Sequence, residues 1–220
     1  LLDTVIGVSV AIFLNEVNSK LFVKASQTVL LFPYFISWVA VHFFLYNLLA
    51  TRGGLVNNLL MALGGKGVAW YSTPAPWTLI ITFIILWKNS GMNSVIFLAA
   101  ISGIDQELYE AAIIDGSNRW QNIFYITIPC LIPTITILSL LGLGKVFYGD
   151  FGMIYAIIGD NGVLYPKTDI IDTYVYRALR KTGDPSSAMA ISLTQSLLGF
   201  IAVMISNATV KKINPDGVLF

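Results

Sequence analysis

The chain has 220 residues, of which 56% are hydrophobic and only 11% are charged, whereas soluble domains carry about 25% charged residues. Its formal net charge of +1 excludes a strongly basic surface, so we expect no nucleic acid partner. A single cysteine, Cys130, rules out an intrachain disulfide. A single histidine, His42, stands in an apolar run without a second histidine or a carboxylate at helical spacing, so we expect a hydrogen-bonded group between helices and no metal site.

Five apolar stretches are candidates for crossing a membrane, which takes about 20 helical residues. They are Leu1–Leu14, Thr28–Ala50, Pro76–Ile101, Ile126–Tyr148 and Ser187–Val210. The first begins without a methionine or a cationic leader, and we expect the chain to start partway through a longer protein. Because the stretches are apolar all round, the sequence predicts an all-α, polytopic transmembrane helical bundle with about five spans in one domain, residues 1–220.

Three longer connections separate the later spans and differ in character. Thr51–Ala75 is rich in Gly, Asn and Pro, which is typical of an irregular loop. Gly149–Ser186 contains an amphipathic helix, which we place outside the membrane. Gly103–Tyr125 is polar but patterned. Lysines and arginines are divided between the connections, so the positive-inside bias does not orient the chain.

The patterned connection predicts two short helices joined by a sharp turn. Asp105 can cap the first helix, and Gly116 provides a left-handed end for it. Asn118 and Gln121 are spaced as a capping box for the second helix, and Pro129 marks where a new helix would begin. Such a segment is either a lever moved by a soluble partner or an interfacial loop on the lipid headgroups. The spacing alone leaves both hypotheses open.

Glu110-Ala111-Ala112, Gly116 and Ile126-x-Ile128-Pro129 together resemble the signature loop of binding-protein-dependent ABC importer permeases. That pattern reads Glu-Ala-Ala, three residues, Gly, nine residues, Ile, one residue, Leu, Pro, and this chain departs from it only by Ile128. Further stretches are similar to the carbohydrate branch, in particular to permeases for oligosaccharides and polysaccharide fragments: Asn15–Val17, Phe32–Trp38, Gly53–Asn57, Gly152–Tyr155 and Thr173–Arg177.

The resemblance implies a type I ABC importer permease in a bacterial cell membrane, with the first family span missing before Leu1. It implies that residues 103–125 form a cytoplasmic coupling loop. Glu110 would contact an ATPase, Ala111 and Ala112 would seat in its groove, and Gly116 would shape the turn. The full coupling set is Glu107, Leu108, Glu110, Ala111, Ala112, Asp115 and Gly116.

The resemblance also implies the partners. They are a second homologous permease subunit, cytoplasmic ATP-binding subunits, an extracellular or periplasmic solute-binding protein, a carbohydrate substrate and membrane lipid. The chain contains no Gly-x-x-x-x-Gly-Lys-Ser/Thr loop, so we expect no cofactor in it and no enzymatic activity; ATP and Mg²⁺ would be bound by the partner ATPase subunits.

Polar residues within a span are functional candidates because they are costly in lipid. One group in the span before the coupling loop suits a sugar, because aromatic rings stack on sugars while amides and hydroxyls bond to their hydroxyls: Trp87, Lys88, Asn89, Ser90, Met92 and Asn93. A second group at the end of the next span is Tyr148, Asp150 and Phe151. The alternative for both groups is polar packing between helices.

Two competing functions remain open at the level of sequence. A secondary transporter or channel not driven by ATP would need carboxylates near the membrane centre, and the Asp and Glu residues here cluster in the connections. The second competing function is that of a purely structural membrane subunit. Co-purification of an ATPase would separate both from a permease.

Overall fold

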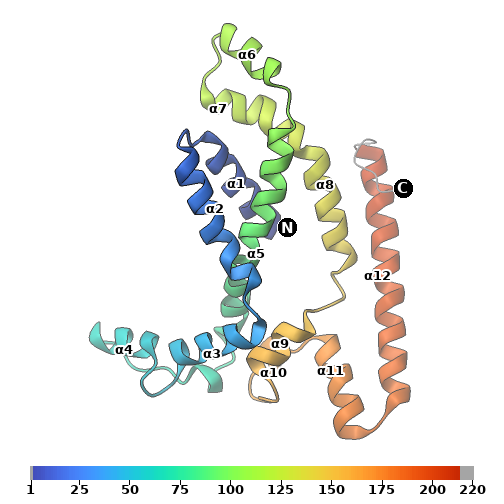
Figure 1. Ribbon diagram of the computed structural model, residues 1–220. Coiled ribbons are helices and arrows are strands. Elements are labelled where there is room, and N and C mark those ends of the chain that lie inside the picture. Colours follow the sequence, from blue (N-terminus) through green and yellow to red (C-terminus); the bar gives the residue numbers. More distant parts are fainter. Residues whose placement is uncertain (1, 214–220) are drawn as a thin grey trace. The chain divides into compact units, whose positions relative to one another are not determined.

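The computed structural model describes residues 2–213 (Figure 1). In this part of the chain the secondary structure is helical, without strands, as the sequence predicts. The α-helices are α1 (Leu2–Glu16), α2 (Lys20–Phe35), α3 (Trp38–Leu49), α4 (Leu55–Ala62), α5 (Trp77–Ser102), α6 (Gln106–Ile114), α7 (Arg119–Asn122), α8 (Ile128–Gly144), α9 (Phe151–Ile158), α10 (Tyr165–Thr168), α11 (Ile171–Arg177) and α12 (Pro185–Ile213). A 3₁₀ turn covers Trp70–Ser72, and π-helical turns cover Ile123–Thr127 and Ala178–Thr182.

Within the described residues, three helical segments are long and apolar enough to cross a membrane, or four if the bent pair α2–α3 counts as one broken span. They are Trp77–Ser102, Arg119–Gly144 and Pro185–Lys211. The sequence predicted about five. The first predicted stretch forms α1, a helix of 15 residues, and its predicted truncation at Leu1 lies outside the described residues.

The prediction of one continuous helix over Thr28–Ala50 is wrong, because Ile36 and Ser37 are not helical and separate α2 from α3. Ser37 is in an extended conformation and caps α3, its hydroxyl accepting the N–H of Ala40 at 3.2 Å. A new helix start is thus built into the middle of the apolar run, which hydropathy does not detect.

The prediction that a new helix begins at Pro129 agrees with the start of α8 at Ile128, but the chain does not break there, because one helical segment runs from Arg119 through to Gly144. Proline removes one N–H donor and its ring clashes with a carbonyl of the preceding turn. Here the preceding turn is π-helical, and the N–H of Ile128 donates to the carbonyl of Ile123, five residues back. The wider turn lets the proline sit inside the helix.

The chain divides into two compact units, and α5 and α12 contribute to both. Among the described residues, the first comprises 2–35, 86–144 and 200–213, and its core contains Ala11, Phe97, Ile101 and Leu131. Gly91 of α5 lies so close to α2 that a Cβ there would overlap the carbonyl oxygen of Leu30. Small residues permit this kind of close helix packing in a membrane.

The second unit comprises residues 36–85 and 145–199. In it α9 packs against α3 through an apolar face that includes Met153 and Ile157. His42 Nδ1 lies 3.2 Å from the carbonyl oxygen of Ile157. This confirms the prediction that the histidine is a hydrogen-bonded group between helices.

The prediction of an irregular loop over Thr51–Ala75 is only partly right, because the helix α4 lies within it. Asn57 of α4 is fully buried and organises the rest of this loop. Its Nδ2 donates to the carbonyls of Ala50, Thr51 and Val68 at 3.3, 3.2 and 2.8 Å. Its Oδ1 accepts from the N–H of Val68 and from Trp70 Nε1, both at 3.0 Å. One side chain therefore replaces the regular backbone bonding that the loop lacks.

Candidate coupling and transport sites

The predicted coupling segment forms a short helix, α6, that presents both charge and apolar side chains to the surroundings. Asp105 caps it, as predicted: its Oδ1 accepts the N–H of Glu107 at 3.0 Å. The coupling set of the sequence analysis lies on this helix and at its end, where Glu107, Leu108, Glu110, Ala111, Asp115 and Gly116 are exposed and Ala112 is half-buried. Ile113 and Ile114 are also exposed, at 63% and 85%. Sequence reasoning did not include these isoleucines in the coupling set.

The C-terminal end of α6 is a Schellman turn around Gly116, which has φ = +84°. The N–H of Ser117 donates to the carbonyl of Ala112 at 2.9 Å, and the N–H of Gly116 donates to Ile113 at 3.0 Å. This pair of bonds satisfies carbonyls at the helix end that otherwise have no partner. The predicted left-handed stop is confirmed.

The second helix of the segment starts with the predicted capping box. The N–H of Gln121 donates to Asn118 Oδ1 at 2.9 Å, and the N–H of Asn118 donates to Gln121 Oε1 at 2.7 Å. Since α7, the π-helical turn and α8 are continuous, this box is the start of a membrane span. Figure 1 shows α6 and α7 following one another beyond the C-terminal end of α5.

Tyr109 and Thr127 connect α6 to that span through their hydroxyls, which lie 2.9 Å apart. Thr127 is buried, at 2% exposure, in the π-helical turn. Force applied to α6 therefore has a direct polar path into the helix, in addition to the covalent one through Gly116. Sequence reasoning missed this pair, although Thr127 as a polar residue within an apolar run was a usable signal.

In the first candidate transport group, the polar side chains of α5 face different neighbours. Lys88 is 7% exposed and donates from Nζ to the carbonyls of Pro33 and Tyr34 at 2.9 and 2.8 Å. These carbonyls end α2 at its break from α3. Asn93 lies against α1, where a Cβ on Gly7 would come 2.8 Å from its Cβ.

The other members of this group are more accessible. Met92 is 37% exposed, and Trp87, Asn89 and Ser90 are half-buried. Ser90 donates back to the carbonyl of Trp87 at 3.3 Å. The group is thus spread around α5 and does not form one face, and its role in a sugar path stays a prediction.

The second candidate group lies in the other unit. Tyr148 is 45% exposed and donates to Ser196 Oγ at 3.0 Å. Asp150 caps α9 by accepting the N–H of Met153 at 2.8 Å. Phe151 stacks on Tyr155 with ring centroids 5.2 Å apart. These contacts order the α8–α9 connection and leave aromatic surface beside it.

An ion pair stabilises the predicted amphipathic region, between Arg177 and Asp169. Burial alone would raise the pKa of the Asp169 carboxyl, but hydrogen bonds from Arg177 and Thr173 hold that pKa below its usual value. The guanidinium also lies over the Tyr165 ring, 4.1 Å from its centroid. The pair joins the end of α10 to the end of α11.

Residues 4–215 match the family model described as "Binding-protein-dependent transport system inner membrane component". The chain belongs to this family. It is 33% identical over 213 residues to the polygalacturonan/rhamnogalacturonan transport system permease protein YteP of Bacillus subtilis, a match that covers 97% of this chain and 66% of YteP. It is 30% identical over 192 residues to the lactose transport system permease protein LacF of Rhizobium radiobacter, covering 85% of this chain and 63% of LacF. The chain thus spans just under two thirds of the length of these relatives.

A solved structure agrees with this family assignment. The chain is similar, with a TM-score of 0.91 and 33% identity, to a chain of a bacterial alginate ABC transporter crystallised in complex with alginate pentasaccharide-bound periplasmic protein. The match covers 98% of this chain and 74% of that chain. These findings confirm the predicted all-α importer-permease fold and a multi-pass protein of the inner membrane. The family is a membrane component of a transport system and not an enzyme.

Proposed function

We propose that the chain is the permease subunit of an ATP-driven importer and forms half of the path for an oligosaccharide or polysaccharide fragment. The observation that carries the proposal is α6: an exposed helix, closed by the Gly116 turn and tied to a membrane span through Tyr109 and Thr127. An exposed helix joined this closely to a span can transmit the movement of a soluble partner. The similarity to permeases of polygalacturonan and lactose transport systems supports a saccharide as cargo.

The partners follow from this role. ATP-binding subunits would dock on α6 from the cytoplasm, and they would bind ATP and Mg²⁺. A second homologous permease would complete the path, and a solute-binding protein would deliver the saccharide on the other side of the membrane. A structurally similar alginate transporter was crystallised with such a periplasmic protein. Trp87 and Asn89, half-buried on α5, are the proposed sugar contacts.

A secondary transporter is less well supported, because the three described spans contain no Asp or Glu for ion coupling. Co-purification distinguishes the two functions. A tagged chain extracted from its native host in mild detergent should retain an ATPase, and Glu110→Lys should strongly reduce its yield. Lys24→Glu, a change of charge of the same size and opposite sign at an exposed position on α2, is the control and should retain it. A wild-type chain without ATPase, or a Glu110→Lys variant with a normal yield, would refute the proposal.

The proposed orientation needs a separate test. Ile114→Cys on α6 and Lys66→Cys before α5 are exposed positions separated by one span. In a Cys130→Ala background, an impermeant maleimide should label Lys66→Cys on intact cells and Ile114→Cys only in inverted vesicles. The reverse pattern would place α6 outside the cell and rule out coupling to a cytoplasmic ATPase.

A further inference from the structure

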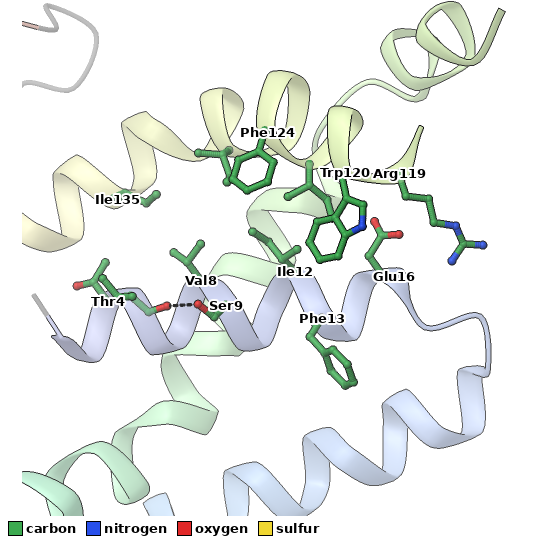
Figure 2. Close-up of a pocket in the computed structure, with 13 residues that line it drawn as sticks. Thr4, Val8, Ser9, Ile12, Phe13, Glu16, Arg119, Trp120, Phe124 and Ile135 are labelled. Atoms are coloured by element: carbon green, nitrogen blue, oxygen red, sulfur yellow. Dashed lines mark hydrogen bonds between the residues drawn. The ribbon is translucent and has the colours of Figure 1, made fainter. Parts of the chain in front are cut away.

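An apolar groove of about 700 Å³ runs along the first unit between α1 and the continuous helix α7–α8. Its walls carry Val8 and Ile12 on one side and Ile123 and Phe124 on the other. Figure 2 shows Glu16, Trp120 and Arg119 together at one end of the groove, with Thr4 and Ile135 at the other end. The function proposed above does not involve this groove.

A second cavity, of about 310 Å³, adjoins the charged end of the groove and shares Glu16 and Arg119 with it. Its lining is polar and includes Asn15, Gln106 and Asn122. The two cavities together form one amphipathic site, with an apolar shaft and a polar head. A transmembrane helix would need only the shaft, whereas a lipid needs both parts.

The length of the shaft suits one acyl chain. Thr4 and Glu16 are twelve residues apart on α1, or about 18 Å at the helical rise, close to the roughly 15 Å of hydrocarbon in one leaflet. At the charged end α1 stops, α5 stops and α7 starts. Helix ends and polar side chains gather there, which is typical of the headgroup level.

The charged side chains at this end of the groove indicate which lipid headgroup fits. Glu16 is half-buried and Arg119 is exposed. Neither side chain takes part in an ion pair within the part of the chain that the structure describes. One acid and one base at the same opening complement a headgroup that carries an ammonium and a phosphate. We propose that this site binds a phospholipid of the phosphatidylethanolamine type, with its phosphate at Arg119, its ammonium at Glu16 and one acyl chain in the groove.

Occupancy of this site would bear on coupling, because Ile123 and Phe124 belong to the π-helical turn that joins α7 to α8. An acyl chain packed on that turn supports its apolar side, where the regular hydrogen-bond ladder is interrupted. The lipid would lie in the same leaflet as the coupling segment.

Photo-crosslinking tests the proposal on the full chain with its co-purified subunits. The complex is placed in phosphatidylcholine nanodiscs that contain a trace of either phosphatidylethanolamine or phosphatidylcholine with a diazirine on the acyl chain, and adducts are mapped by mass spectrometry. We expect adducts on residues 4–16 and 119–135 to be about tenfold more frequent with the ethanolamine probe, since only its ammonium can donate to Glu16. Glu16→Gln should abolish that difference, Val8→Phe should reduce adducts of both probes by filling the shaft, and Lys24→Gln should change neither.

Equal labelling by the two probes would overturn the proposed headgroup selection. Absence of adducts from both segments in the wild type would overturn the lipid site. A preference that survives Glu16→Gln would do the same for the role of the carboxylate. Native mass spectrometry of the wild-type and Arg119→Gln complexes gives an independent measurement: retained phosphatidylethanolamine should be lost in the variant, and equal retention would contradict the site.

Discussion

The turn at Gly116 offers a clean perturbation of the proposed coupling segment. Its φ of +84° is left-handed, and a Cβ built there meets nothing within 4 Å. Gly116→Ala therefore adds no clash, and its cost is the left-handed backbone alone, about 1–2 kcal/mol. That strain acts on the Ser117 and Gly116 hydrogen bonds that close α6. A cost of this size should raise the open population of the turn by roughly 5- to 30-fold.

Hydrogen exchange of the amides in residues 112–117 measures this opening directly, and saccharide-stimulated ATP hydrolysis in the reconstituted transporter measures its consequence. We expect faster exchange and weaker stimulation in Gly116→Ala, and nearly normal behaviour in Gly116→Asn, because asparagine tolerates the left-handed region. Gly64→Ala is the matched control: its φ is +81°, it too has open space at the Cβ, and it lies in a loop of the other unit. Faster exchange at the turn together with unchanged coupling would refute the role of the turn as a mechanical element.

Three further predictions concern stability. Asn57→Leu should cost about 2–4 kcal/mol, because several buried backbone and indole groups lose their partner, and fluorescence-detected size exclusion after heating should show a lower melting temperature. The ion pair of Asp169 and Arg177 should stabilise the fold above the ordinary carboxyl pKa of about 4 and lose that effect as the pH falls through the lowered pKa of the folded state; the gap in melting temperature between wild type and Arg177→Gln should therefore close in acid. Gly91→Val should lower the yield of folded protein by pushing α5 off the backbone of α2, while Gly142→Val, whose Cβ meets open space, should not.

Local sequence signals predicted the coupling segment well because its structure is local. Asp105, Gly116 and the pair Asn118–Gln121 each satisfy backbone groups within a few residues of themselves. Such contacts depend on spacing along the chain, and spacing is visible in the sequence. The link between Tyr109 and Thr127 joins residues 18 apart; Thr127 stands out as a polar residue in an apolar run, but no local spacing identifies its partner.

Hydropathy failed where a break in a helix lies inside an apolar run. A window average over Thr28–Ala50 reports composition and does not detect that Ser37 starts a second helix. Pro129 correctly marked the start of α8, but the sequence did not show that the helical segment continues without a break through the preceding π-helical turn. In both places the outcome depends on backbone hydrogen bonds, which composition does not encode.

Lys88 shows how a helix break and a polar residue within a span are related. From sequence it was a candidate for the sugar path, because an ammonium inside a span needs a reason to be there. In the structure its Nζ lies on two carbonyls at the end of α2, where the break from α3 has removed their helical partners. A cation at a helix C-terminus is also favoured by the helix dipole. The lysine and the break therefore explain each other: the bend exposes carbonyls that must be bonded, and a donor about 55 residues later in the chain supplies the bond.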